Sequence, residues 1–315
     1  MVEHGISATQ AVVTMDAALP GIIWGWMITL NMWAKSVGTG VILVGAYLIY
    51  RYKKEDIEGI RWKMPLISFI FLNIFLLFTL TDLHQPYRMI NIFLHPHWTS
   101  AITVGAWMAS LFTLLITIML VIGFVDAHPD VARHNGLAKT AREHSGFYEK
   151  VFPFVIFLAI PVTLYTAIIM AESSARELWQ APTELMQMML AAFMAGAAAL
   201  VFISGSWSRD ARKDLAVVLV LAVFFSFLMY MGEYFFSFKS EEAEATLKYV
   251  HAGGAYNVQF WLAMGLGYVI PFFLGLSTMK SDNKTLLRFA AILALIGLYL
   301  AKDVWLKIPQ MLPLS

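Results

Sequence analysis

The sequence predicts an all-α integral membrane protein with eight transmembrane helices and both termini in the periplasm. Composition is the first observation behind this prediction: the 315-residue chain is 59% hydrophobic and 14% charged, whereas a soluble domain carries about 25% charged residues. The second observation is the pattern along the chain. Long hydrophobic stretches are joined by loops that alternate between basic and nearly uncharged. No soluble domain fits between the stretches, so residues 1–315 are predicted to form one transmembrane domain.

The hydrophobic stretches have the length that a bilayer requires. A hydrocarbon core about 30 Å thick needs about 20 apolar residues in an α-helix. Stretches of this kind lie at 21–49, 64–81, 101–125, 151–171, 184–204, 215–237, 257–277 and 286–303. Small residues within them, above all the run AAFMAGAAA at 191–199, predict close packing of helix against helix.

The distribution of lysine and arginine predicts the orientation in the membrane. Loops 51–63, 126–150, 205–214 and 278–288 together hold 15 of these residues, and the segments on the opposite side hold 6. Basic loops stay in the cytoplasm. We therefore expect a bacterial inner-membrane protein with periplasmic termini. The net charge of +1 gives no indication of nucleic-acid binding.

Lys35 is the most unusual residue of the first span. It lies about 14 residues inside the span, which corresponds to a depth of about 21 Å. A lysine at this depth is costly unless it is paired, hydrated or neutral. The candidate partners are Asp82, Glu172 and Glu233. Lys35 is expected either to lock two helices together through a buried ion pair or to act directly on a ligand or a proton.

Acidic residues from three other spans are predicted to lie at one depth near the outer face. Asp82 ends the second span, Glu172 ends the fourth, and Glu233 approaches the end of the sixth. Asn31 and Tyr165 lie at a similar level. Polar groups from several helices at one level predict a cavity, although each acid taken alone is equally well explained as an interfacial residue that contacts water.

Cysteine and histidine limit the chemistry of the chain. The chain has no cysteine, which excludes disulfides and cysteine-ligated clusters within it. Its histidines all lie outside the predicted spans, so a transmembrane haem with two histidine ligands is not expected. No metal site is predicted. His84 is a candidate proton acceptor near the outer face, because imidazole titrates near neutral pH.

Short motifs connect the chain with a known family. The segment 82–88 reads DLHQPYR, similar to a D-L-x-x-P-x-R motif at the end of the second span. Trp24-Gly25-Trp26 opens the first span, and Tyr165-Thr166 in the fourth is followed by LWQAP at 178–182. With its eight spans, the chain resembles the NrfD/PsrC-type membrane subunits of polysulfide reductase and of alternative complex III.

The resemblance implies a quinone-binding subunit of a respiratory oxidoreductase with no redox cofactor of its own. Such a subunit binds menaquinone or ubiquinone near the outer side. It exchanges electrons with a periplasmic ferredoxin-like iron–sulfur subunit, beyond which lies a molybdopterin or multihaem catalytic subunit. Asp82, Pro86 and Arg88 match the family motif. Lys35 stands where the family has small, uncharged residues, so it is a candidate to replace the usual contact with the quinone ring.

The residues divide into expected roles on this interpretation. Asp82, His84, Glu172 and Glu233 are predicted to transfer protons. The predicted quinone-binding residues are Asn31, Lys35, Asp82, His84, Arg88 and Tyr165. Two other functions stay open: a proton- or ion-translocating module, which buried charges would also serve, and a purely structural anchor.

Overall fold

The computed structural model describes residues 22–312 except 84, 135, 174–175 and 236–239, and this part of the chain is helical with no strand. Eight of its helical segments are long and apolar enough to cross a membrane. These are α2 (Trp26–Arg51), α3 (Ile60–Asp82), α5 (Ala101–Ala127), α8 (Gly146–Ala171), α9 (Ala181–Val201), α10 (Arg209–Phe235), the continuous segment Asn257–Ser281, and α14 (Lys284–Lys307) with its extension to Met311. The predicted all-α class and the eight spans are therefore confirmed.

Shorter helices occupy the connections between the spans. The seventh span is built from α12 (Asn257–Leu262), a π-helical segment (Ala263–Val269) and α13 (Ile270–Ser281). The other short helices are η1 (Pro86–Ile90), α4 (Asn91–Leu94), α6 (Val131–His134), α7 (Gly136–Glu143), η2 (Glu177–Trp179), η3 (Ser204–Ser206), α11 (Glu241–Leu247) and η6 (Ile308–Met311).

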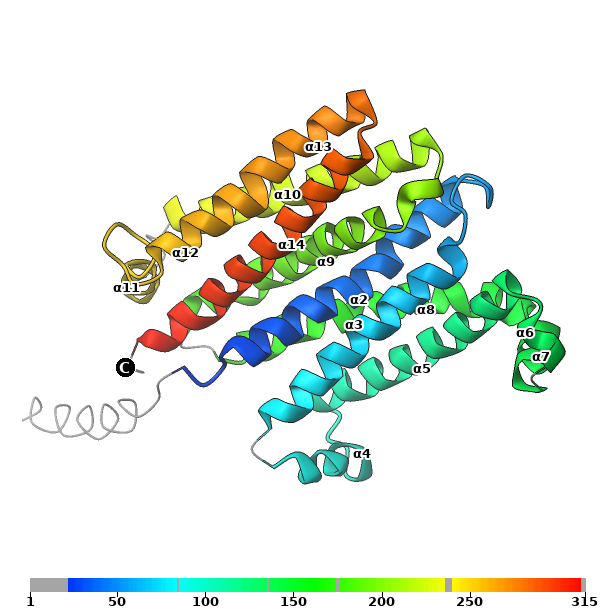
Figure 1. Ribbon diagram of the computed structural model, residues 1–315. Helices are drawn as coiled ribbons and strands as arrows, with labels where there is room; N and C mark the ends of the chain where they lie inside the picture. The colour runs from blue at the N-terminus through cyan, green and yellow to red at the C-terminus, as the bar shows by residue number, and fades with distance from the viewer. Residues whose placement is uncertain (1–21, 84, 135, 174–175, 236–239, 313–315) are drawn as a thin grey trace, which may run out of the picture.

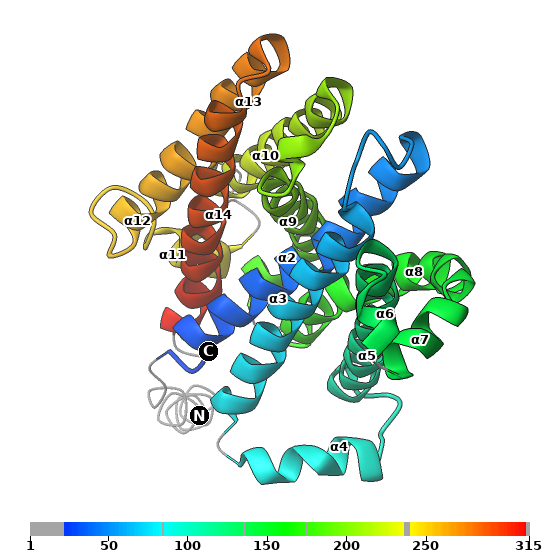
Figure 2. The same ribbon diagram turned by 45° about the vertical axis from the view of Figure 1, so that its right-hand side comes forward.

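The spans form two groups that meet along α2 and α9 (Figures 1 and 2). The first bundle contains α2, α3, α5 and α8, and the second contains α9, α10, α13 and α14. The described chain begins and ends at the same end of the molecule, which we call the terminal end. The basic loops predicted from the sequence lie at the opposite end, which we call the basic end (Figure 1).

Glycine allows α2 and α9 to touch through their backbones. A Cβ atom on Gly40 would overlap the carbonyl oxygen of Ala192, and one on Gly196 would overlap the carbonyl group of Gly40. Both helices are mostly buried as a result. The close packing that the small residues at 191–199 predict is therefore confirmed, and it joins the two bundles.

Gly40→Ala should destabilise the protein by about 1–3 kcal/mol, because the added methyl group forces α2 and α9 apart. The loss is measured as a lower midpoint of thermal unfolding in detergent. Gly232→Ala in α10 is the control, since a Cβ there meets nothing within 4 Å. Equal midpoints for the two variants would contradict the backbone contact.

Ion pairs join neighbouring helices at the basic end. Arg51 Nε lies 2.5 Å from Asp214 Oδ2, and the hydroxyl of Tyr52 donates to the same oxygen at 2.8 Å. Arg212 Nη2 lies 2.5 Å from Asp282 Oδ2. The hydrogen bond from Arg212 holds the pKa of the Asp282 carboxyl below its ordinary value. These contacts fix the loops that connect the spans at this end.

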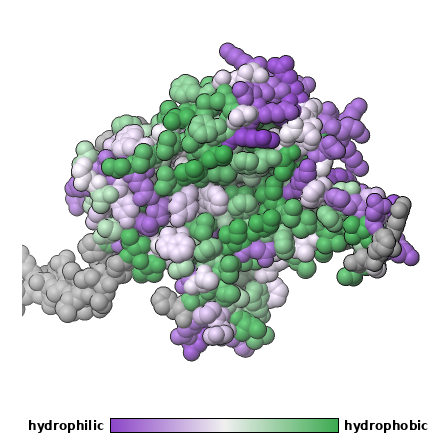
Figure 3. Space-filling model, viewed as in Figure 1, coloured by the Kyte–Doolittle hydropathy of each residue, from purple (hydrophilic) through white to green (hydrophobic). Residues whose placement is uncertain are grey.

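Apolar side chains cover the outside of the bundles. Large residues such as Leu114, Phe157 and Phe273 are exposed along the spans. Figure 3 shows hydrophobic side chains over the middle of one face and hydrophilic ones gathered toward its basic end. A surface of this kind is expected to face lipid rather than water.

Candidate functional site

A cavity of about 630 Å³ opens at the terminal end of the first bundle. Helices α2, α3, α5 and α8 supply its walls, and residues of η1 and α4 cover it. Its volume lies within the range of about 300–1,000 Å³ that is usual for small-molecule sites. Apolar side chains dominate the lining, and the polar residues in it are Asn31, Asn73, Thr79, Asp82, Ser110, Tyr165 and Thr166.

Asn31 presents an acceptor to this cavity. Its side chain is 6% exposed, and its amide Nδ2 donates to the carbonyl oxygen of Phe75 at 2.9 Å and to Thr79 Oγ1 at 2.5 Å. Because both amide hydrogens are used within the protein, the Oδ1 oxygen is the group available to a ligand. The structure therefore favours the role of an acceptor for Asn31.

Lys35 lies directly behind the cavity wall. It is 0% exposed, its ammonium group donates to Thr166 Oγ1, and Nζ lies 4.5 Å from the centre of the Tyr165 ring. Within the described part of the chain, no carboxylate forms an ion pair with Lys35, so the three candidate acids are not its ion-pair partners. The reason is that Lys35 faces α8, which presents a threonine and a tyrosine at this level.

Tyr165 forms part of the wall between Lys35 and the cavity. Its ring makes an edge contact with Phe75 at a centroid distance of 6.4 Å. Gly105 in α5 makes room for the ring, since a Cβ at that position would overlap it. Tyr165 is thus held by packing from three helices.

The structure separates the acids that the sequence places at one depth. Asp82, half-buried at the end of α3, lines the cavity with Asn31 and Tyr165. Glu172 is exposed and is not part of the lining. Glu233 is buried in the second bundle, where it interacts electrostatically with Glu184. Equal depth therefore does not bring residues together, because their helices turn them to different sides.

The segment after α3 forms the cover of the cavity. Met89 and Phe93, from η1 and α4, contribute to the lining. Arg88 in η1 is exposed and does not belong to the lining. His84 lies outside the described residues, so its predicted role stays a prediction.

Glu184 and Lys302 are buried ionisable residues that hydropathy and residue spacing along the chain did not predict. They lie near the ends of α9 and α14, where the sequence suggests residues at the membrane surface. Each one falls on the helix face that carries buried neighbours, Gln187 and Met188 in α9 and Leu298 and Trp305 in α14. Helical spacing from these neighbours is the signal that would have identified them.

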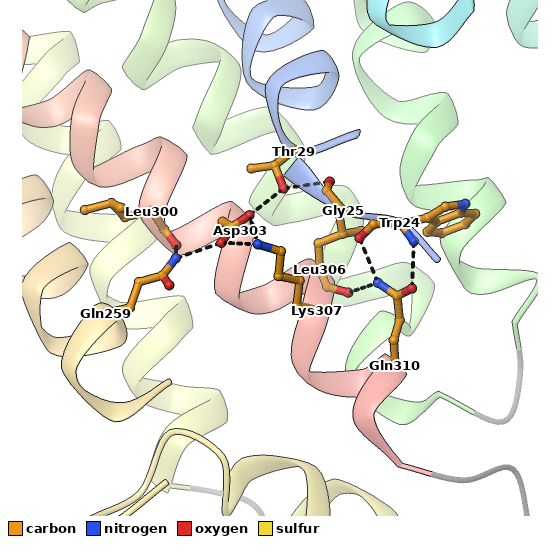
Figure 4. A network of polar contacts seen from close by, with 9 residues as sticks. All are labelled: Trp24, Gly25, Thr29, Gln259, Leu300, Asp303, Leu306, Lys307 and Gln310. Carbon is orange, nitrogen blue, oxygen red and sulfur yellow. Dashed lines mark hydrogen bonds and ion pairs between the residues drawn. The ribbon is translucent and has the colours of Figure 1, made fainter. Parts of the chain in front are cut away.

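A polar network around Asp303 fixes the start of α2 against the second bundle (Figure 4). Thr29 donates to Asp303 Oδ1 at 2.9 Å. Gln259 donates to Oδ2 at 2.8 Å, and the ammonium of Lys307 donates to the same oxygen at 2.7 Å. Three elements, α2, α12 and α14, therefore share one buried carboxylate.

A second contact in the same region positions a residue of the cavity. Gln310 Oε1 accepts from the backbone N–H of Trp24 at 2.9 Å, and Gln310 Nε2 donates to the Trp24 carbonyl at 3.1 Å (Figure 4). Trp24 lines the cavity and stacks on Trp179 with ring centroids 5.3 Å apart. Gln310 of η6 thus holds one wall of the site in place.

Asp303→Ala should lower the free energy of unfolding by about 1–3 kcal/mol, because it leaves the half-buried Lys307 ammonium and two other donors without their acceptor. Thermal unfolding in detergent measures the loss. Asp210→Ala, at an exposed acid of the basic end, is the control and should behave like the wild type. An Asp303→Ala protein as stable as the control would show that the network contributes little.

A protein-family model matches nearly the whole chain. Residues 15–311 match a family model described as polysulphide reductase, NrfD, and this range contains all eight spans and the cavity. None of the curated proteins matches the chain. Members of the family are membrane subunits of redox complexes. The chain belongs to the polysulphide reductase NrfD family.

Proposed function

We propose that this chain is the quinone-binding membrane subunit of a multi-subunit oxidoreductase and exchanges electrons between the quinone pool and a periplasmic iron–sulfur subunit. The observation that supports the proposal most strongly is the cavity of the first bundle. It combines a large apolar lining with a few polar groups, and a buried ammonium group stands behind its wall.

The residues of the cavity fit the two parts of a quinone. Apolar side chains such as Ile28, Leu80 and Ile169 suit the isoprenoid tail. In the quinol form, one ring hydroxyl can donate to Asn31 Oδ1, and the hydroxyl of Thr166 can bond the other ring oxygen. Thr166 Oγ1 accepts from Lys35, so its own hydrogen remains able to bond a ring oxygen.

The same residues can handle the protons of the reaction. Oxidation of a quinol releases two electrons and two protons. Asn31 Oδ1 can accept a hydrogen bond from a quinol hydroxyl, and the carboxylate of Asp82 can take up a proton at the edge of the cavity. The positive charge of Lys35 stabilises negative charge that develops on a ring oxygen. Electrons leave to the partner subunit.

The orientation of the molecule completes the proposal. With the basic end in the cytoplasm, the terminal end and its cavity lie on the periplasmic side. An iron–sulfur subunit that docks at the terminal end would then be close to the quinone. The reverse direction, reduction of quinone, uses the same groups.

Binding of a short-chain quinol, kept reduced in the absence of oxygen, to the purified protein tests this function. Trp24 lines the cavity, so a bound quinol should quench tryptophan fluorescence. Asn31→Leu should weaken quinol binding about tenfold to a hundredfold, because the lost hydrogen bond from a ring hydroxyl to Asn31 Oδ1 costs about 1–3 kcal/mol. Asn91→Leu, at an exposed position outside the lining, should bind as the wild type does. Unchanged affinity in Asn31→Leu, or no saturable binding by the wild type, would refute the proposal.

A further inference from the structure

A second, much smaller cavity lies on the other side of the wall formed by Met32, Met170 and Leu306. Its volume is about 10 Å³, and these three side chains line both cavities. Helices α9, α10 and α14 supply the rest of its walls, and the residues from them are Glu184, Gln187, Met188, Tyr230, Lys302, Trp305. One layer of side chains therefore separates this space from the cavity proposed to bind quinone.

The polar groups around the small cavity lack the partners that buried groups normally have. Glu184 is 2% exposed and Gln187 is 7% exposed. Glu184 Oε1, Gln187 Nε2 and Trp305 Nε1 have no hydrogen-bond partner within the described part of the protein. Lys302, 4% exposed, donates to the Met188 sulfur at 3.3 Å, and sulfur is a weak acceptor.

These groups together match the bonding capacity of one water molecule. A water molecule needs a space of about 10–15 Å³ and two to four polar partners. It can donate to Glu184 Oε1 and accept from Gln187 Nε2 and Lys302 Nζ. Such a molecule would connect the carboxylate and the ammonium, which interact electrostatically but form no direct ion pair in the described structure.

We propose that Glu184, Gln187 and Lys302 hold one water molecule and form with it a proton-loading site for the carrier in the neighbouring cavity. The inference rests on the proposed function. When a quinol is oxidised, its two electrons pass to the partner's iron–sulfur centre and its two protons stay with the protein. Asp82 takes one proton. The other is transferred through water to Glu184, whose carboxylate becomes a neutral carboxylic acid, while Lys302 remains an ammonium.

The surroundings of the pair support this transfer. Met32 and Met170 have unbranched, flexible side chains, so the wall can admit a second water molecule during turnover. Glu233 from α10 acts electrostatically on Glu184, Glu184 acts on Tyr230, and Lys302 acts on Lys35 of α2. The charge of Lys302 is therefore coupled to that of Lys35, which lies behind the wall of the larger cavity.

Infrared difference spectroscopy of the membrane-embedded complex, oxidised minus quinol-reduced, tests the site. The wild type should show two carboxylic-acid C=O bands on quinol oxidation, one from Asp82 and one from Glu184, and both should shift in ²H₂O. Glu184→Gln should keep the band that Asp82→Asn removes, lose the other band, and lower kcat about tenfold to a hundredfold, with the quinol affinity unchanged. Glu241→Gln, at an exposed acid of α11, should retain both bands and the activity. Both bands in Glu184→Gln would overturn the proposal.

A second variant covers the case in which Glu184→Gln does not assemble, because that change leaves the Lys302 ammonium without its carboxylate. The double variant Glu184→Gln with Lys302→Met removes both charges at similar volume, and it should assemble and show the Asp82 band alone. Two carboxylic-acid bands in this double variant would overturn the inference equally. A failure of the proposed function gives a different result from a failure of this inference, because in that case the wild type would not bind quinol at all.

Discussion

Lys35→Met should lower quinol-dependent electron transfer about 100- to 1,000-fold, the loss expected when one preorganised charged donor is removed from a water-poor site. The ammonium is fully buried and its hydrogen bond goes to Thr166, a residue of the cavity lining. Removing it takes away the positive charge nearest to the proposed position of the quinone ring. Methionine fills a similar volume, so the wall of the cavity stays in place.

The protein should still fold when Lys35 is replaced. Breaking a buried ion pair is strongly destabilising because one charge is left alone, but no carboxylate pairs with Lys35 in the described structure. Quinol oxidation by the purified complex, together with the yield of assembled complex, measures both effects. Lys280→Met, at an exposed residue of the basic end, is the matched control. Full activity of Lys35→Met would remove this residue from the mechanism.

Asp82→Asn should lower kcat about 100- to 10,000-fold while KM changes little. The carboxylate lines the cavity at the end of α3, and asparagine keeps its shape but cannot take up a proton. Loss of a positioned proton acceptor typically costs this factor, and a change confined to kcat indicates an effect on the reaction rather than on binding.

The control for Asp82→Asn is Glu172→Gln. Both acids end a span at the terminal end, but Glu172 is exposed and does not line the cavity. Steady-state kinetics over a series of quinol concentrations should show wild-type values for Glu172→Gln. If instead the two variants lose activity equally, proton uptake does not depend on the cavity.

Hydrophobic length is enough to predict the eight spans of this chain, because a helix that crosses lipid must be apolar over a fixed distance. The ends of the spans are harder to predict from the sequence. The sixth span is expected at 215–237, whereas α10 begins at Arg209. Charged residues such as Arg212 extend the helix beyond the hydrocarbon, where Asp282 satisfies the guanidinium, and hydropathy alone does not detect this turn.

The candidate site shows what depth along a helix can and cannot predict. Asn31, Asp82 and Tyr165 are expected at one level, and the structure places all three in the lining of one cavity. Glu172 and Glu233 are expected there as well but lie elsewhere. The rotation of each helix depends on contacts between spans, such as that of Gly40 with Gly196, and these contacts are not visible from the charges.

A structure of the purified complex with bound quinol tests the central claim most directly. We expect density for the quinol ring in the cavity of the first bundle, with one ring oxygen within hydrogen-bonding distance of Asn31 Oδ1 and the other within hydrogen-bonding distance of Thr166. Quinone density at another place, or a cavity filled by a lipid chain while quinol turnover continues, would contradict it.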